Sequence, residues 1–269
     1  MLILAAKLPA YRHLVDDAIE FSKNKTTEPL ERINWLLDKL AVNIGCELLK
    51  LIPGRVSTEV DARLSFNAPA MIERSRRLIQ LYEEKGISRE RVLIKLATTW
   101  EGCLACKTLE SEGIHCNMTL IFSLPQAVAA AEAGATLISP FVGRILDWHL
   151  AATGKSSIPP TEDPGVLSVH TIYNYFKKYG YSTVVMGASF RNIGEIIELA
   201  GCDLLTVSPK LLAQLTAGTD TVTRKLSPEE AKKMDIPRIP TDESSFRWLL
   251  NEDRMATEKL SDGMYLNLL

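Results

Sequence analysis

The sequence lacks several features that would assign a function class at once. It has only 5 cysteines in 269 residues, an odd number scattered over a long chain, which argues against a disulfide framework. No apolar run approaches the ~20 residues that a membrane-spanning helix needs. The opening "MLILAAKLPAYR" has no basic region before its apolar part, which Lys7 interrupts, so no secretory signal is expected. These absences predict a cytoplasmic protein with reduced thiols and no membrane partner.

An excess of charge of one sign is also lacking. The chain has 31 basic and 33 acidic residues and a net charge of −2, which gives no global field to recruit nucleic acid. Cys103 and Cys106 have C-x-x-C spacing, but no second pair of cysteines or histidines completes a tetrahedral set of ligands. The four histidines, which form no cluster, are His13, His115, His149 and His170. The sequence therefore predicts no metal site, no nucleic-acid partner and two ordinary buried or half-buried thiols.

The residues that are present predict alternating strands and helices. From Gly54 onward, short runs rich in β-branched residues alternate with longer amphipathic segments, and glycines often close the latter. Such alternation implies a parallel sheet with right-handed crossovers. We expect six strands, over Val56 to Asp61, Val92 to Ala97, Cys116 to Phe122, Thr136 to Phe141, Thr183 to Gly187 and Leu204 to Val207.

Helices are expected before, between and after these strands. The segment "PLERINWLLDKLAVNIGCELLKLI" precedes the first strand, and "DESSFRWLLNEDRMATEKLSD" follows the last one as another helix. Between strands, "VHTIYNYFKKYG" and "NIGEIIELAG" are predicted to stop at Gly180 and Gly201. There is no linker of low complexity and no repeat beyond the strand and helix unit. With 46% hydrophobic residues, the chain suits a single domain over residues 1–269.

Polar residues at the strand ends help to choose between a doubly wound sheet and a (β/α)8 barrel. A doubly wound sheet concentrates function at one switch point, whereas a barrel spreads it over many carboxyl ends of strands. Polar residues follow almost every predicted strand: Asp61, Arg63, Thr98, Thr99, Ser123, Arg144, Ser189, Arg191 and Ser208. A closed barrel needs eight strands, and only six are found. The predicted fold class is therefore α/β, a (β/α)8 TIM-barrel family fold that is incomplete here.

Lys95 interrupts the apolar strand in "RVLIKLATTW". Burying an ammonium without a partner is expensive, so this residue needs an explanation. In one interpretation its stem packs while its head reaches water at the strand end. In the other, it is desolvated by Ile94, Leu96 and the neighbouring strands and held as a neutral amine that attacks a carbonyl carbon.

Glu59 and Thr119 are the candidates to assist such an amine. Loss of water from a carbinolamine needs a positioned proton carrier, and these residues would project from the strands on either side of Lys95. Each also has a structural interpretation. Glu59 would be a sheet-end carboxylate paired with Arg63, and Thr119 an ordinary β-branched residue of a strand.

Two Ser and Arg pairs predict an anion site. Ser139 with Arg144 in "ISPFVGRI", and Ser189 with Arg191 in "GASFRN", follow two strands that should be close in space. The guanidinium fork matches phosphate oxygens, and serine hydroxyls with helix N-terminal amides complete such a cradle. Two isolated surface arginines are the alternative, but the paired pattern favours a phosphate site.

Several strings together resemble the transaldolase family: "LKLIPGRVSTEVDARLS", "RVLIKLATTWEG", "CNMTLIFS", "ISPFVGRILDW" and "YSTVVMGASFRNIGEIIELAGCDLLTVSP". The resemblance is collinear from about Leu8 to Asp262. It implies a (β/α)8 barrel enzyme of the non-oxidative pentose phosphate pathway. Such an enzyme moves a dihydroxyacetone unit from sedoheptulose 7-phosphate or fructose 6-phosphate to an aldose phosphate. The reaction proceeds through a lysine Schiff base, without cofactor or metal.

The same resemblance assigns roles to nine residues. The catalytic set that it implies is Lys95 as the Schiff-base lysine, with Glu59 and Thr119 holding the catalytic water. The implied substrate-binding set is Asn117, Ser139, Phe141, Arg144, Ser189 and Arg191, of which the arginines bind phosphate and Phe141 forms an apolar wall. The resemblance also implies a homodimer.

The sequence departs from the family pattern at both ends. The family's first two strands carry an aspartate that shuttles a proton and an asparagine that helps to hold substrate, and they have no counterpart before "LILAAKLPAYRHLVDDA". After "EKLSDG" the family continues a long helix near the active site, whereas this chain stops at "MYLNLL". We expect an open barrel, with edges at the strands around Glu59 and Val207, and exposed edges invite pairing.

These departures leave two alternative functions. One is a catalytically impaired splice form or fragment that acts through binding, because loss of a general acid or base costs ~10²- to 10⁴-fold in rate. The other is a Schiff-base aldolase that releases dihydroxyacetone without transferring it to an acceptor.

Overall fold

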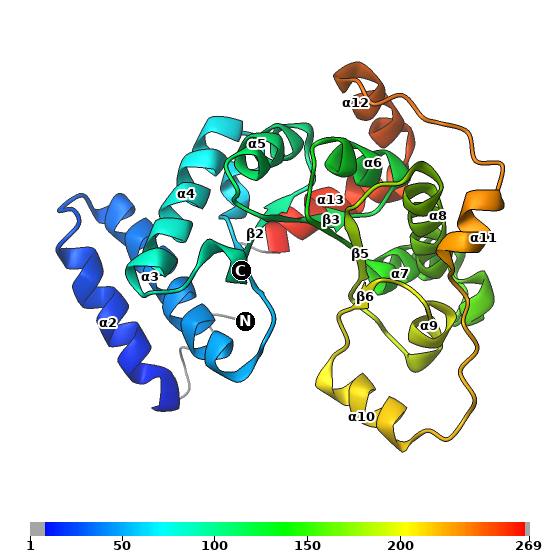
Figure 1. The fold of residues 1–269 in the computed structure, drawn as a ribbon, viewed down its shortest axis with the longest axis horizontal. Helices are drawn as coiled ribbons and strands as arrows, with labels where there is room; N and C mark the ends of the chain where they lie inside the picture. Colours follow the sequence, from blue (N-terminus) through cyan, green and yellow to red (C-terminus); the bar gives the residue numbers. More distant parts are fainter. Residues whose placement is uncertain (1–8, 267–269) are drawn as a thin grey trace.

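Six parallel strands, each paired with the next along the chain, form the centre of the fold (Figure 1). The computed structural model describes residues 9–266. The strands are β1 (Val56–Glu59), β2 (Val92–Ala97), β3 (Cys116–Ile121), β4 (Leu137–Pro140), β5 (Val184–Gly187) and β6 (Leu204–Leu205). Each lies within the segment predicted for it, so the alternating strand and helix pattern is confirmed.

Helices precede, connect and follow the strands. The α-helices before β4 are α2 (Arg12–Lys23), α3 (Pro29–Leu51), α4 (Ala68–Glu84), α5 (Trp100–Ser111) and α6 (Leu124–Glu132). Those after β4 are α7 (Val142–Thr153), α8 (Pro164–Tyr179), α9 (Ile193–Glu198), α10 (Pro209–Ala217), α11 (Pro228–Lys233), α12 (Glu243–Glu252) and α13 (Arg254–Leu266). Short 3-10 helices are η1 (Pro9–Tyr11), η2 (Ala62–Leu64), η3 (Arg89–Arg91) and η4 (Pro160–Glu162). No helix within residues 9–266 is long and apolar enough to cross a bilayer.

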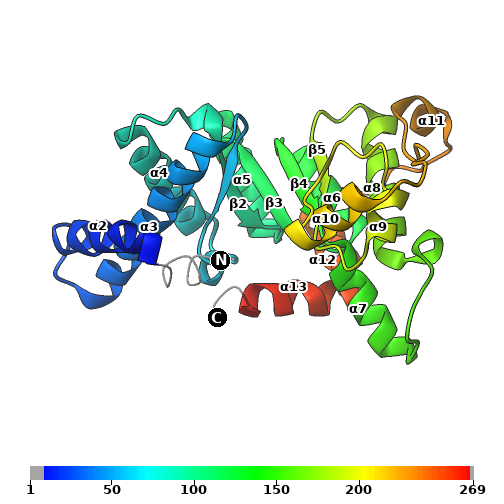
Figure 2. The same cartoon turned by 90° about the horizontal axis from the view of Figure 1, so that it is seen from below.

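The sheet curls into an open part of a barrel whose outer face is covered by helices (Figures 1 and 2). Ile94 of β2 and Met118 of β3 are buried in the main apolar core on this outer side. Since side chains alternate along a strand, Lys95 and Asn117 face the inner side. Among the described residues, β1 and β6 each pair with one strand only, which confirms the two expected edges. The fold is therefore a six-stranded, open member of the (β/α)8 barrel class.

The helices α3 and α4 fix the edge strand β1 from outside. A Cβ atom at Gly45 would overlap the hydroxyl of Tyr82, so a glycine is needed where α3 passes α4. The Tyr82 hydroxyl is in turn hydrogen-bonded to Thr58 Oγ1 over 2.7 Å, and both side chains are buried. This chain of contacts holds β1, the strand that carries Glu59.

A β-bulge ends the regular pairing of β3. The register shifts between Thr119 and Ile121, and Leu120 adopts a φ of 57°. The fully buried Gln126 supports this conformation, because its Nε2 donates to the Leu120 carbonyl over 3.1 Å and its Oε1 accepts from the Phe122 amide over 3.0 Å. Side-chain hydrogen bonds thus replace the ladder bonds that the bulge interrupts.

The single helix predicted over "DESSFRWLLNEDRMATEKLSD" is wrong, because the chain turns at Asp253. This residue has a ψ of 91°, and its Oδ1 accepts from the Ala256 amide over 2.9 Å as the cap of α13. The two helices pack on different surfaces. In α12, Arg247 pairs with Glu101 of α5, whereas Leu260 of α13 lies in a separate apolar cluster at the strand ends. The sequence pattern continues through the turn, since both helices need an apolar face.

Of the two helix ends predicted at glycines, one is confirmed and one is wrong. Gly180 caps α8 in the left-handed conformation, as predicted, whereas α9 stops at Glu198, three residues before Gly201. Residues 1–8, part of the opening stretch in which no secretory signal is expected, lie outside the described residues, as do the final residues 267–269.

Candidate active site

Lys95 and Glu59 face one another across neighbouring strands. The strand register places Glu59 beside Lys95, and Lys95 Nζ lies 3.2 Å from Glu59 Oε2. The two side chains are 25% and 35% exposed, so the pair lies on the open inner face of the sheet. Arg63, the partner considered for Glu59 from the sequence, forms its own ion pair with Asp61. Lys95 is therefore a partly buried amine within hydrogen-bond distance of a carboxylate.

Beside this pair, two hydrogen bonds extend across the inner face, one part-buried and one buried. Asn117 of β3 donates its Nδ2 to Ser57 Oγ over 3.0 Å and accepts at Oδ1 from Ser139 Oγ over 2.7 Å. Asn117 and Ser139 are each 2% exposed. These bonds tie β1 to β3 and β3 to β4, and they fix the Asn117 amide beside Lys95, its neighbour in the strand register.

Thr119 lies two residues beyond Asn117 and therefore projects to the same face of β3. It is fully buried, and its hydroxyl oxygen has no hydrogen-bond partner among the residues that the structure describes. A hydroxyl can both donate and accept. Both its donor and its acceptor capacity are therefore unused among these residues.

Arg144 and Arg191 are brought together by a close backbone approach. The start of α7 lies against the segment after β5, where Val142 N donates to Ala188 O over 2.9 Å and Gly143 N to Ser189 O over 3.1 Å. A Cβ atom at position 143 would overlap the Ser189 carbonyl oxygen, so only glycine allows this approach. The predicted proximity of the two Ser and Arg strings is thus confirmed for their backbones.

The electrostatics of this pair favour an anion. Burial, followed by the charge of Arg191, lowers the pKa of Arg144, whose guanidinium also lies 4.9 Å from the Phe141 ring centroid. Arg191 pairs with Asp147 at 2.6 Å and donates to Ser189 Oγ over 3.3 Å. Two arginines and one aspartate thus leave net positive charge at these neighbouring strand ends, and a guanidinium matches phosphate oxygens.

Ser189 has an unusual backbone conformation within this site. Its φ of 66° lies in the left-handed region, which non-glycine residues seldom adopt. Arg191 Nη1 donates to the Ser189 carbonyl over 2.9 Å and so helps to hold the turn. Strained conformations of this kind gather at ligand sites, because the surrounding structure must maintain them.

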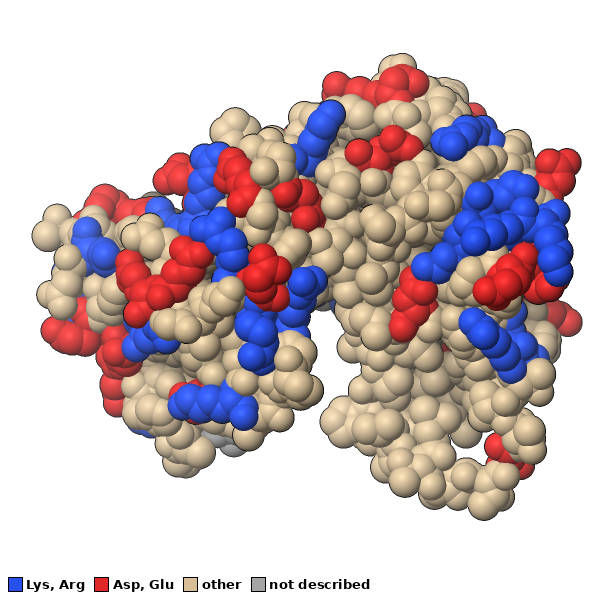
Figure 3. Space-filling model, viewed as in Figure 1, with Lys and Arg blue, Asp and Glu red and all other residues tan. Residues whose placement is uncertain are grey.

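The charged side chains on the face drawn in Figure 3 are of both signs. Figure 3 shows Lys and Arg interspersed with Asp and Glu over this face, and a hollow between the part of the chain around α3 and the part around α10. At the α10 side, a pocket of about 370 Å³ is lined by residues that include Arg191, Ser208 and Lys210. The cationic site is thus local, as the net charge of −2 predicts.

The sequence did not single out Ser57 or Asp147. Ser57 precedes Glu59 by two residues in "VSTE", so the period of a strand could have placed both on the inner face. Asp147 follows Arg144 by three residues on one helix, but its partner is Arg191 on another segment. No sequence signal predicts that long-range pair.

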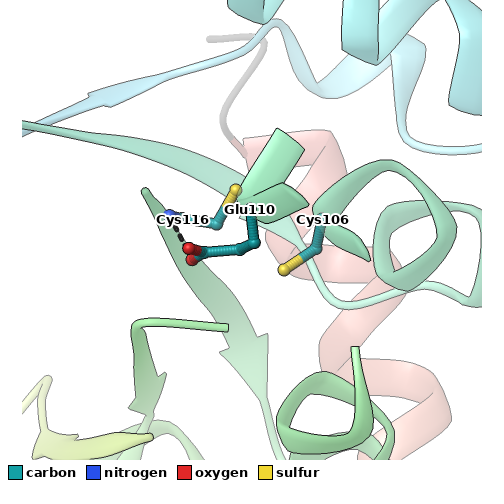
Figure 4. A group of neighbouring side chains, drawn as sticks. All are labelled: Cys106, Glu110 and Cys116. Atoms are coloured by element: carbon teal, nitrogen blue, oxygen red, sulfur yellow. Dashed lines mark hydrogen bonds between the residues drawn. The ribbon is translucent and has the colours of Figure 1, made fainter. Parts of the chain in front are cut away.

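Cys106, Glu110 and Cys116 form a separate cluster with ligand atoms within 4.8 Å of one another (Figure 4). Glu110 Oε1 accepts from the amides of Cys116 and Thr136 over 2.8 and 2.7 Å, and its Oε2 from the Thr136 hydroxyl over 3.1 Å. A hydrogen bond with Cys106, then burial, raises the pKa of the Cys116 thiol. Because the Glu110 carboxylate accepts from the backbone amides of both segments, this cluster secures the beginnings of β3 and β4. Cys103 and Cys106 are buried thiols, as predicted.

Comparison with known proteins decides the family. The family model described as Transaldolase/Fructose-6-phosphate aldolase matches residues 2–266. This chain belongs to the transaldolase family. The transaldolases of Rattus norvegicus and Homo sapiens are each 60% identical to it over 265 residues, which are 98% of this chain and 79% of theirs. The transaldolase of Edwardsiella ictaluri is 57% identical over 264 residues, 98% of this chain and 83% of its own.

Within the transaldolase family fold, the residues singled out from the sequence form two groups in this structure. The first group lies on the neighbouring strands β1 to β4, where hydrogen bonds or strand pairing connect its members. It consists of Glu59, Lys95, Asn117, Thr119 and Ser139. The second group lies after β4 and β5 and consists of Phe141, Arg144, Ser189 and Arg191. One group offers an amine with a carboxylate, and the other offers positive charge.

Proposed function

We propose that this chain is a transaldolase in which Lys95 forms a Schiff base with a ketose phosphate. The observation that carries the proposal is the distance of 3.2 Å between Lys95 Nζ and Glu59 Oε2 on the inner face of the barrel. Membership of the transaldolase family supports it. Its substrates would be sugar phosphates such as sedoheptulose 7-phosphate or fructose 6-phosphate as donors, and an aldose phosphate as acceptor.

Imine formation begins with a proton transfer. Only a neutral amine attacks a carbonyl, and Glu59 is within hydrogen-bond distance to take a proton from Lys95. The nitrogen lone pair then forms a bond to the carbonyl carbon, the carbonyl oxygen gains a proton and the nitrogen loses one, which gives the carbinolamine. Return of a proton to that hydroxyl group releases water and leaves the protonated imine. A water held between Glu59 and the otherwise unpaired Thr119 hydroxyl would carry these protons.

Cleavage and transfer follow from the imine. The hydroxyl group on C4 of the ketose loses its proton to Glu59 through the bound water, and its oxygen becomes the aldehyde oxygen as the C3–C4 bond breaks. The electron pair of that bond forms the C2–C3 double bond while the imine pair moves to the protonated nitrogen, so the aldose phosphate leaves and the dihydroxyacetone unit stays on Lys95 as an enamine. Attack by this unit on the aldehyde of an acceptor reverses the sequence. Asn117, Ser139 and Ser189 would bind sugar hydroxyls beside the Phe141 wall. The two arginines would bind the terminal phosphate, which positions the carbonyl for attack.

Borohydride trapping tests the proposal. The purified chain is incubated with fructose 6-phosphate and borohydride, and the adduct is located by intact mass and peptide mapping. We expect a reduced adduct on Lys95, no adduct in Lys95→Met, and wild-type labelling in Lys107→Met, which removes an exposed lysine of α5. A folded wild-type chain that yields no Lys95 adduct overturns the proposal.

An aldolase without transfer is the second candidate, because the matching family model is described as including fructose-6-phosphate aldolase. The two activities differ in their need for an acceptor. A transaldolase turns over fructose 6-phosphate beyond one equivalent only when an aldose phosphate such as erythrose 4-phosphate is present as acceptor. Release of free dihydroxyacetone without acceptor would identify the aldolase. Binding of substrate with neither product would identify the catalytically impaired alternative.

A homodimer and a cytoplasmic location complete the proposed description. Both rest on the sequence and on family membership, and both stay predictions. Light scattering of the purified chain measures the first, and cell fractionation with an antibody measures the second.

A further inference from the structure

Two buried carboxyl groups meet beside the segment that carries Arg191. Asp163 is 1% exposed and begins α8, where its Oδ1 accepts from the amides of Gly165 and Val166 over 2.8 and 3.4 Å. Glu195 is fully buried in α9, and its Oε2 accepts from the Arg191 amide over 2.7 Å. Each carboxyl group therefore uses one oxygen to hold the start of a helix or the turn before it.

The second oxygen of each carboxyl group is buried without a hydrogen-bond donor among the described residues. These oxygens are Asp163 Oδ2 and Glu195 Oε1, and the segments that carry them are in contact, since a Cβ at Gly194 would lie 2.5 Å from Pro160 Cγ. Each of the two carboxyl groups also acts on the ionisation of the other. Ionised carboxylates can only accept hydrogen bonds. A hydrogen bond between them consequently requires a proton on one of the two oxygens.

The surrounding charges do not replace that proton. The charged residues and histidines on α8, α9 and the elements packed against them include Glu132 of α6, Arg144, Asp147 and His149 of α7, Glu162 of η4, His170, Lys177 and Lys178 of α8, Arg191 before α9, Glu198 of α9, Lys210 of α10, and Glu229, Glu230, Lys232 and Lys233 of α11. The Arg191 guanidinium pairs with Asp147, so only its backbone amide reaches Glu195. His149 favours the charged form of Asp163, but desolvation by burial is the larger influence.

We propose that Asp163 and Glu195 share one proton, and that this shared proton holds the Arg191 segment in its anion-binding position. This inference rests on the proposed function, in which Arg191 binds the substrate phosphate. Asp163 and Glu195 act as positioning residues, because they reach the phosphate only through the Arg191 backbone. A rise in pH that removes the proton would place two negative charges in one buried site and loosen the segment.

The direction of the pH effect follows from burial. Desolvation raises the pKa of Asp163, and it raises the pKa of Glu195 from 4.5 to about 7. The folded chain therefore holds a proton that the unfolded chain releases. The stability that this proton contributes is fully present below about pH 4.5 and is lost as the pH rises through 7.

The central experiment compares wild type with Glu195→Gln between pH 6.5 and 9. A glutamine imitates the protonated acid, since its oxygen can accept from the Arg191 amide while its NH₂ donates to Asp163. If binding requires the shared proton, the KM of wild type for fructose 6-phosphate rises about tenfold more over this range than that of Glu195→Gln. Glu162→Gln, which removes an exposed charge next to Asp163, should follow wild type.

Two further measurements keep the outcomes distinct. Glu195→Ala should raise the KM at every pH while kcat changes less than threefold, because the residue acts on binding. The melting temperature of wild type should fall relative to that of Glu195→Gln between pH 6 and 8, and this needs no substrate. Equal pH profiles of wild type and Glu195→Gln in KM and melting temperature overturn the inference. Absence of a Lys95 adduct in wild type would instead overturn the proposed function, and the melting comparison would still test the shared proton.

Discussion

Glu110 shows how much a single side chain can hold in this fold. Its carboxylate accepts from the backbone amides that open β3 and β4, two strands of the proposed site. Replacing it with alanine leaves both amides without this partner in a partly buried position. We expect Glu110→Ala to lower the free energy of unfolding by about 2–4 kcal/mol, measured by urea denaturation.

The matched control for Glu110 is Glu112→Ala on the same segment. Glu112 pairs with the exposed Arg76, and exposed pairs contribute only about 0–1 kcal/mol. Equal losses in the two variants would contradict the structural role of Glu110. If the Cys106, Glu110 and Cys116 cluster is structural as described, a chelator should also leave the melting temperature of wild type unchanged.

Gly143 is the second position where one residue decides the geometry. Any Cβ there overlaps the Ser189 carbonyl oxygen, which belongs to backbone and cannot rotate away. We expect Gly143→Ala to cost about 1–3 kcal/mol of stability and to raise the KM for fructose 6-phosphate, since Arg144 and Arg191 move apart. Denaturation and steady-state kinetics measure these effects.

Gly54→Ala provides the comparison for Gly143. A Cβ at Gly54 meets nothing within 4 Å, so its stability should stay within about 0.5 kcal/mol of wild type. A Gly143→Ala variant as stable and active as Gly54→Ala would contradict the close approach of α7 to the Ser189 segment.

At the residue scale, the sequence predicts the candidate site residues better than it predicts their hydrogen-bond and ion-pair partners. Lys95 stands out because a cation interrupts a buried run, and that signal is local. Its contact with Glu59 required the strand order, which the alternating pattern supplied. The bond from Ser139 to Asn117 and the ion pair of Arg191 with Asp147 depend on distances across the fold, which no spacing in the sequence encodes.

At the scale of elements, the turn between α12 and α13 is the largest difference between prediction and structure. Asp253 ends one helix and caps the next, so it sets the direction in which α13 crosses the strand ends. We expect Asp253→Ala to cost about 1 kcal/mol in urea denaturation, the usual effect of losing such a cap. Glu252→Ala, one residue earlier and exposed, should change stability by less than about 0.5 kcal/mol, and a larger loss there would contradict the assignment.

Strands were predicted closely because their signals are short and redundant. A run such as Val92–Ala97 is buried except at Lys95 and is bounded by polar residues, so its ends are visible. The bulge at Leu120 was not predicted, since its cause is the hydrogen bonding of Gln126 in the following helix. The pattern "SLPQ" is a capping-box signal and could have indicated that Gln126 turns back toward the strand. The two-residue β6 shows how far a strand can shrink at an edge.

At the scale of the whole molecule, buried acids of high pKa predict alkaline sensitivity. Burial raises the pKa of Tyr82 to about 12 and that of Cys202 to about 11. Both groups are neutral when protonated, so the folded chain keeps protons that the unfolded chain loses above its ordinary values of 9 to 10. Stability is therefore complete below about pH 9 and falls as the pH rises through 11 to 12.

Each proton retained in this way changes stability by about 1.4 kcal/mol per pH unit. Urea midpoints measured from pH 8 to 10.5 should therefore decline, and Tyr82→Phe should decline less steeply than wild type. Phenylalanine removes the titrating group but also the hydrogen bond to Thr58, so its stability at pH 8 is the reference for that slope. Midpoints that stay constant up to pH 10.5 would contradict the assignment.

Because the sheet is open, Lys95 and Glu59, the proposed proton-transfer pair, stand on strands that differ in their resistance to local unfolding. Lys95 stands on β2, which has a strand on each side, whereas Glu59 stands on β1, which has one neighbouring strand among the described residues. Amide hydrogen exchange should therefore be slower in β2 than in β1, because an edge strand opens at a lower free energy cost. Fraying of β1 would carry the carboxylate away while the amine stays in place. The fraction of molecules able to catalyse would then depend on the opening of a single strand. A ligand that bridges β1 and β2 would slow amide hydrogen exchange in β1 more than in β2.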